Sequence, residues 1–175
     1  MSPDHYRDFR LTMQAEVPMP AMMSKLFQNL HFGIVRFGVG RVAVSFPEAD
    51  VTLGAVLRLH GTMSDLDAFG TDWTRALKRM VTCGDIEPSP TGAPLKVIKR
   101  LRTDGGPAWQ RRLVRRHGAD VLGALPKFTE PRTPFVRVQS ASTGQTFVMH
   151  LMMTDPSPET RDPDSYGLGS PIPRF

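Results

Sequence analysis

Apolar and polar side chains alternate in three short stretches in the first third of the chain. Within residues 6–13, 42–46 and 56–60, apolar side chains alternate with polar or small ones at most positions. A period of two is typical of strands with one buried face. In the first stretch, the apolar side carries Phe9, Leu11 and Met13. The pattern predicts a strand at each of the three stretches.

Two segments have the longer period of a helix. After Pro20, a residue that favours helix starts, five apolar side chains fall within about 140° of arc. They are Met22, Met23, Leu26, Phe27 and Leu30. We expect this stripe to face the core and Gly33 to end the helix. A second helix is predicted from Ser64, which forms a capping box with Asp67, to about Cys83, where Gly84 ends it.

A fourth strand is predicted at residues 95–101, after a loop rich in Pro and Gly. The order strand, helix, strand, strand, helix, strand is the split βαβ arrangement of ferredoxin-like domains. We therefore expect an α+β fold with an N-terminal ferredoxin-like (RRM-like) βαββαβ domain over residues 1–92. A C-terminal domain would occupy residues 93–175. Because RNA-binding modules and unrelated enzymes share this order, it does not by itself assign a function.

The second half of the chain predicts a helix, a hairpin and an irregular tail. Pro107 and Gly118 bracket a helix over residues 108–117. Two extended stretches, 135–142 and 145–153, are joined by Thr143-Gly144, the length of a tight turn. The tail from Thr154 is rich in Pro, Gly and Asp, a composition typical of disorder.

Positive charge is concentrated between Leu95 and His117. That segment carries eight Lys and Arg residues against one acid, a net charge of +7, whereas the whole chain carries +5 and the other 152 residues −2. On the predicted helix, four arginines span about 140° of arc opposite Leu113 and Val114. They are Arg111, Arg112, Arg115 and Arg116.

Like charges four residues apart on a helix repel each other, so we expect an anionic partner for these arginines. Arginine over lysine favours phosphates held by two hydrogen bonds, or guanine edges. A basic face exposed only to solvent is the alternative.

Composition excludes several other classes of function. A single cysteine, Cys83, rules out an internal disulfide, and no CxxC, HExxH or acidic cluster offers a metal site. We therefore expect chemistry without metal or cofactor. No apolar run is long enough to span a membrane, and the N-terminal residues are too polar for a signal peptide. We expect a cytoplasmic protein without membrane contact.

Five segments of the chain, in the same order, resemble the CRISPR-repeat endoribonucleases of the subtype I-F systems, the Csy family. They are DHYRDFRL at 4–11, LFQNLH at 26–31, RRLVRRH at 111–117, QSASTGQTF at 139–147 and SYGL at 165–168. The resemblance implies that the protein binds the stem-loop of CRISPR repeat RNA and cuts 3′ of the stem without metal. A ribose 2′-OH would attack the adjacent phosphate and leave a 2′,3′-cyclic phosphate. The protein would stay on the mature crRNA hairpin, with other Cas proteins of a type I-F-like complex as partners.

The resemblance also implies three catalytic residues. His31 matches the family's catalytic histidine, Ser140 the serine that holds the nucleophilic 2′-OH, and Tyr166 the tyrosine that orients the histidine. Such chemistry requires a base, a positioning donor and positive surroundings. The helical period places His31 in the last turn of its helix, about 110° from the centre of the apolar stripe.

Further residues are expected to contact RNA. Phe147 matches an aromatic residue that stacks under the last base pair of the stem; its alternative role is core packing in the hairpin. Arg112 and Arg116 match two groove-inserted arginines, and Arg100 matches a base-reading arginine. The remaining predicted contacts are Arg102, Arg111, Arg115, Ser142, Thr143 and Gln145. Ser142 has an equal alternative as an ordinary polar residue before a turn.

Two other functions stay open from the sequence. One is a hairpin-binding subunit of a transposon- or plasmid-borne CRISPR complex that cuts RNA weakly or not at all. The other is a ferredoxin-like protein whose arginine helix binds an acidic surface on a partner protein.

Overall fold

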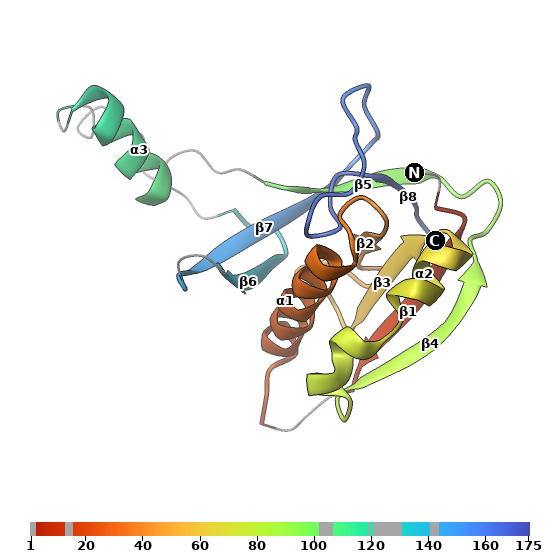
Figure 1. The fold of residues 1–175 in the computed structure, drawn as a ribbon. Helices are drawn as coiled ribbons and strands as arrows, with labels where there is room; N and C mark the ends of the chain where they lie inside the picture. The colour runs from red at the N-terminus through yellow and green to blue at the C-terminus, as the bar shows by residue number, and fades with distance from the viewer. Residues whose placement is uncertain (1–2, 13–15, 102–106, 119, 121–130, 141–143) are drawn as a thin grey trace.

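Two antiparallel sheets and one long helix that contacts both of them organise the chain. The computed structural model describes residues 3–12, 16–101, 107–118, 120, 131–140 and 144–175. Over these residues the chain forms two four-stranded sheets, and helix α1 (Met19–Phe37) contacts both (Figure 1). The α+β class predicted from the sequence is confirmed.

The first sheet has the ferredoxin-like topology. Its strands are β1 (His5–Leu11), β2 (Ala43–Ser45), β3 (Val56–Gly61) and β4 (Val81–Pro88), in the order β2-β3-β1-β4 with antiparallel neighbours. Helix α1 covers one face of this sheet with the five residues of its predicted apolar stripe, all of which are buried. Between β3 and β4 lie the short helix α2 (Met63–Phe69) and the 3-10 helix η1 (Asp72–Leu77).

The predicted second helix has wrong bounds, and the strand predicted at residues 95–101 is present but belongs to the second sheet rather than the first. Thr62, rather than Ser64, caps α2 by accepting a hydrogen bond from the Asp65 backbone N–H, and α2 ends before Gly70. The sheet is then completed by β4, while residues 95–100 form a strand of the second sheet. The pairing of β4 with β1 shifts register between Arg7 and Phe9. Such a bulge interrupts the period of two, which is why the sequence pattern does not predict this strand.

Gly33 does not end α1, contrary to prediction. The helix continues to Phe37, and the Gly38 backbone N–H donates to the Ile34 carbonyl. A Cβ atom at position 33 would lie 3.1 Å from Phe69 Cζ and 3.1 Å from Trp73 Cβ. Gly33 therefore serves close packing, because a side chain there would push away the segment that holds α2 and η1.

The second sheet joins the hairpin to the C-terminal tail. Its strands are β5 (Leu95–Arg100), β6 (Phe135–Gln139), β7 (Thr146–Thr154) and β8 (Pro171–Pro173), in the order β6-β7-β5-β8. The predicted hairpin is confirmed, but its tight turn is wrong. The Ser140 backbone N–H donates to the Gln145 carbonyl, whereas a two-residue turn at 143–144 would pair residue 142 with Gln145; residues 141–143 lie outside the described residues. The expectation of a disordered tail is also wrong, because β8 pairs with β5.

The C-terminal residues cover the second face of the first sheet. Arg58 on β3 is 9% exposed; it binds both carboxylate oxygens of Asp8 at 2.7 and 2.9 Å. Its guanidinium also lies 4.2 Å from the ring centroids of both Tyr6 and Phe175.

Buried residues of both sheets form one continuous core. The proposed domain boundary at residue 92 stays a prediction.

Helix α3 (Pro107–His117) has the predicted bounds and lies apart from both sheets (Figure 1). Gly118, which follows it with a φ of 88°, donates its backbone N–H to the Val114 carbonyl. No helix among the described residues is both long and apolar enough to cross a bilayer.

Candidate active site

His31 is held in one orientation by a ring and a backbone carbonyl. Its side chain projects from α1, and its ring stacks on Tyr166 with centroids 4.1 Å apart and planes at 11°. His31 Nδ1 lies 2.7 Å from the Ser165 carbonyl oxygen. Because a carbonyl can only accept, Nδ1 carries the proton in this hydrogen bond. In the neutral ring, Nε2 then keeps its lone pair and can accept a proton.

The loop that carries Tyr166 is built around Asp164. The Asp164 carboxylate accepts hydrogen bonds from the backbone N–H groups of Tyr166, at 2.8 Å, and Leu168, at 3.0 Å. Gly167 has a φ of 74°, a conformation that favours glycine, and its carbonyl accepts from the Val44 backbone N–H. The first sheet therefore anchors the loop that holds both contacts of His31.

Tyr166 is stacked between a core ring and the candidate catalytic ring. Phe27 lies one helical turn before His31 on α1, and its ring is 5.9 Å from that of Tyr166 with planes at 9°. Burial raises the pKa of the Tyr166 hydroxyl. The positive charge of Arg100 lowers this pKa in part, and the negative charge of Asp164 raises it further. The hydroxyl therefore stays protonated at neutral pH and can act as a hydrogen-bond donor.

A cation and an aromatic ring lie beside this stack. Arg100, exposed at the end of β5, places its guanidinium carbon 5.2 Å from the centroid of the Phe147 ring on β7. The same guanidinium acts electrostatically on the Tyr166 hydroxyl. Phe147 is half-buried and packs against the core, so its predicted core contact exists alongside an accessible ring.

Two hydrogen bonds pack β6, the strand before Ser140, along α1, the helix that carries His31. The Ser24 hydroxyl accepts from the Arg137 backbone N–H at 3.1 Å, and Gln28 Oε1 accepts from the Gln139 backbone N–H at 2.6 Å. Four helical residues and two strand residues advance by about the same 6 Å, so helix and strand keep in step. Ser140 follows Gln139, and His31 lies one turn beyond Gln28. β6 and α1 therefore run in register as far as Gln139 and Gln28, and a common site for Ser140 and His31 stays a prediction.

The arginine helix has the predicted two faces. Arg111, Arg112, Arg115 and Arg116 are exposed, whereas Leu113 and Val114 are half-buried. Gln145 is exposed, and its carbonyl accepts from the Ser140 backbone N–H. Three predicted RNA contacts, Arg102, Ser142 and Thr143, lie outside the described residues. The RNA-binding roles of all these residues stay predictions.

Some features of the site had no sequence signal. Because α1 continues to Phe37, His31 is not in its last turn as predicted. The acceptor for Nδ1 is a backbone carbonyl, which any residue at position 165 supplies. The role of Asp164 could have been inferred from the sequence, because Asp at the first position and Gly at the fourth, here Gly167, are common in β-turns. Among the described residues, no three His, Cys, Asp or Glu side chains come together in an arrangement that could hold a metal ion.

The chain is similar to known CRISPR-associated proteins over most of its length. The family model described as CRISPR-associated protein (Cas_Csy4) matches residues 6–175. A protein named CRISPR-associated endonuclease Cas6/Csy4 from Pseudomonas aeruginosa (strain UCBPP-PA14) is 34% identical over 158 residues, covering 85% of this chain and 84% of the relative. A protein of the same name from Escherichia coli (strain UTI89 / UPEC) is 30% identical over 179 residues, covering 95% of this chain and 96% of the relative. The resemblance seen in the sequence is confirmed, and the chain belongs to the Cas_Csy4 family of CRISPR-associated proteins.

Proposed function

We propose that this protein is an endoribonuclease that processes CRISPR precursor RNA by binding the repeat stem-loop and cutting 3′ of the stem. Family membership and relatives named as endonucleases support nuclease activity. The observation that carries the proposal is the state of His31. Its Nδ1 is committed to the Ser165 carbonyl and its ring is stacked on Tyr166, so Nε2 is available as a base on a rigid helix.

The reaction we propose needs no metal. Nε2 of His31 takes the proton from the 2′-OH upstream of the cut, and the 2′ oxygen attacks the adjacent phosphorus. The bond from phosphorus to the 5′ oxygen of the next nucleotide breaks, and that oxygen takes a proton from water to leave as a 5′-OH, while His31 returns its proton to solvent. The products are a 2′,3′-cyclic phosphate and a free 5′ end. Ser140 holds the 2′-OH in line, and Tyr166 keeps the imidazole oriented.

Positive charge beside the reacting phosphate comes from Arg100. Its guanidinium lies 5.2 Å from the centroid of the Phe147 ring and acts electrostatically on Tyr166, and we propose that it stabilises negative charge that develops on the phosphate. Phe147 would stack under the last base pair of the stem, which determines the phosphate that reaches His31. The Phe147 ring would thus position the RNA, and the Arg100 guanidinium would stabilise the charge that forms at the phosphate brought to His31.

The stem would be held mainly by the arginine helix. Its four exposed arginines form a cationic face without an acid on the same helix, as phosphate binding requires. Arg102, Ser142, Thr143 and Gln145 are proposed as further contacts. Tight binding of the product hairpin would limit the enzyme to a single turnover. The protein would stay with its product as a subunit of a type I-F-like complex with other Cas proteins.

Cleavage of repeat RNA in EDTA tests the proposal. We expect the wild-type protein to cut once, 3′ of the stem, and to leave a 2′,3′-cyclic phosphate. His31→Ala, or a 2′-deoxyribose upstream of the cut, should abolish cutting while hairpin affinity is kept. A requirement for added Mg²⁺, or cutting of the deoxy substrate, would contradict the mechanism. Tight binding without cutting would favour a non-cleaving hairpin-binding subunit instead.

A further inference from the structure

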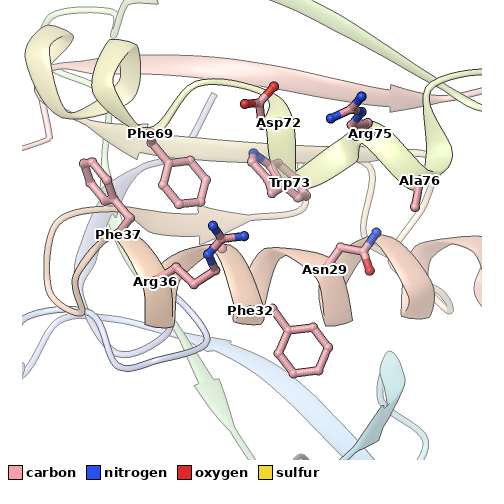
Figure 2. A pocket seen from close by; sticks show the side chains of 10 residues that line it. Asn29, Phe32, Arg36, Phe37, Phe69, Asp72, Trp73, Arg75 and Ala76 are labelled. Carbon is pink, nitrogen blue, oxygen red and sulfur yellow. The ribbon is translucent and has the colours of Figure 1, made fainter.

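A groove runs along another side of α1, between this helix and η1 (Figure 2). It has a volume of about 820 Å³, and its floor is formed where Gly33 lets the two segments approach. The proposed reaction uses none of its lining residues. Those that matter here are Asn29, Phe32, Arg36, Asp72, Trp73 and Arg75.

The groove begins beside the candidate catalytic residue. Phe32 follows His31 on α1, and the two ring centroids are 5.6 Å apart. Phe32 is 43% exposed, although it is a large apolar side chain. An exposed ring next to a reacting nucleotide is a surface on which a base can stack.

Two cations continue the path from Phe32. Arg36 lies one turn further along α1, about 6 Å along the helix axis. Figure 2 shows Arg36 extending from α1 toward η1, and Arg75, which η1 carries, is also among the lining residues. Both arginines are exposed, and with Asp72 as the acid in the lining the groove keeps a net charge of +1. An aromatic ring followed by cations is the arrangement that proteins use to bind single-stranded nucleic acid.

Ring and charge contacts give this path a direction. Arg100 lies over Phe147 and acts on Tyr166, Tyr166 stacks on His31, and His31 contacts Phe32. If the stem ends on Phe147, as the proposed function requires, the strand enters this series of contacts from the Phe147 side. The nucleotides beyond the cut then leave past Phe32.

We propose that this groove binds the single-stranded RNA 3′ of the cut. The first leaving base stacks on Phe32, and the following phosphates interact with Arg36 and Arg75. This inference rests on the proposed function and adds a binding site for the leaving strand. The downstream RNA would thereby increase the affinity for the uncut substrate. After cleavage this short strand would be held by the groove alone and would dissociate.

Binding measurements with two RNAs test the groove. Both carry the repeat hairpin; one ends at the cut, and the other has a six-nucleotide 3′ extension with 2′-deoxyribose upstream of the cut to prevent cleavage. The proteins are the wild type, Phe32→Ala, the double variant Arg36→Gln/Arg75→Gln, and Lys78→Gln as control. Lys78 is exposed directly after η1 but does not line the groove. Thermal melting confirms that each variant is folded.

We expect the extension to tighten wild-type binding about fivefold or more, the lower end of the effect of one stacked base. Phe32→Ala and the double variant should lose this gain and bind the short hairpin like the wild type, whereas Lys78→Gln keeps it. The proposal is overturned if the extension adds no affinity, or if the groove variants weaken both RNAs equally. Unchanged affinities in all variants would also overturn the proposal and leave a protein partner as the remaining candidate occupant of the groove. If neither RNA binds the wild type, the proposed function itself fails.

Discussion

Replacement of Tyr166 by alanine tests how His31 is oriented. The Tyr166 ring stacks on His31 at 4.1 Å, and a pair of this kind contributes about 0.5–1.5 kcal/mol beyond the area it buries. The same loop supplies the Ser165 carbonyl to His31 Nδ1, a hydrogen bond worth about 1 kcal/mol. Removal of the ring also releases the stacking on Phe27 that fixes this loop. A total of about 2 kcal/mol corresponds to an approximately 30-fold slower reaction.

The assay is single-turnover cleavage of repeat RNA with protein in excess, accompanied by hairpin affinity and thermal melting. Tyr166→Ala should cut about 30-fold more slowly with hairpin affinity unchanged. Tyr166→Phe is the matched control, because it keeps the stacked ring and loses only the hydroxyl. It should remain within about threefold of the wild type. Cleavage by Tyr166→Ala at the wild-type rate would refute the orienting role, and an equal loss in Tyr166→Phe would assign the effect to the hydroxyl instead.

Three further predictions concern stability. Burial lowers the pKa of His60 to about 3, below its unfolded value of 6.5, so the unfolded state binds more protons between these values and stability falls as pH drops below about 6.5. Urea unfolding at pH 7 and 5.5 should show the wild type losing about 1 kcal/mol more than His60→Gln, and parallel losses would contradict this. Gly33→Ala should lower the melting temperature, because a Cβ atom 3.1 Å from two side chains crowds the packing. This cost should exceed the gain in helix propensity of about 1 kcal/mol, and a higher melting temperature would count against the packing role. Phe175→Ala removes the ring over Arg58 and should cost about 1–2 kcal/mol in urea unfolding, whereas Arg174→Ala should change stability by less than about 0.5 kcal/mol. Equal effects of these last two variants would show that the ring does not hold the C-terminus.

Local periodicity determined those elements whose residues repeat without interruption. The apolar stripe of α1, the strands around Phe9 and Leu57, and the arginine helix each follow one period that the sequence carries in full. The bulge between β1 and β4 breaks such a period, and Gly33 appears as a helix end because its packing partners come from residues about 40 positions later. Signals of this kind depend on neighbours that the local sequence does not specify.

The candidate site shows the same division. Family resemblance named His31, Ser140 and Tyr166 from short motifs, and the arginine helix followed from charge and spacing alone. Only the tertiary structure brings the Tyr166 ring onto an imidazole 135 positions earlier and directs a backbone carbonyl at Nδ1. Only there does the exposed Phe32 border a groove that Arg36 and Arg75 also line. The physical reason is that side-chain chemistry is encoded residue by residue, whereas orientation depends on long-range packing of a loop, a helix and two sheets.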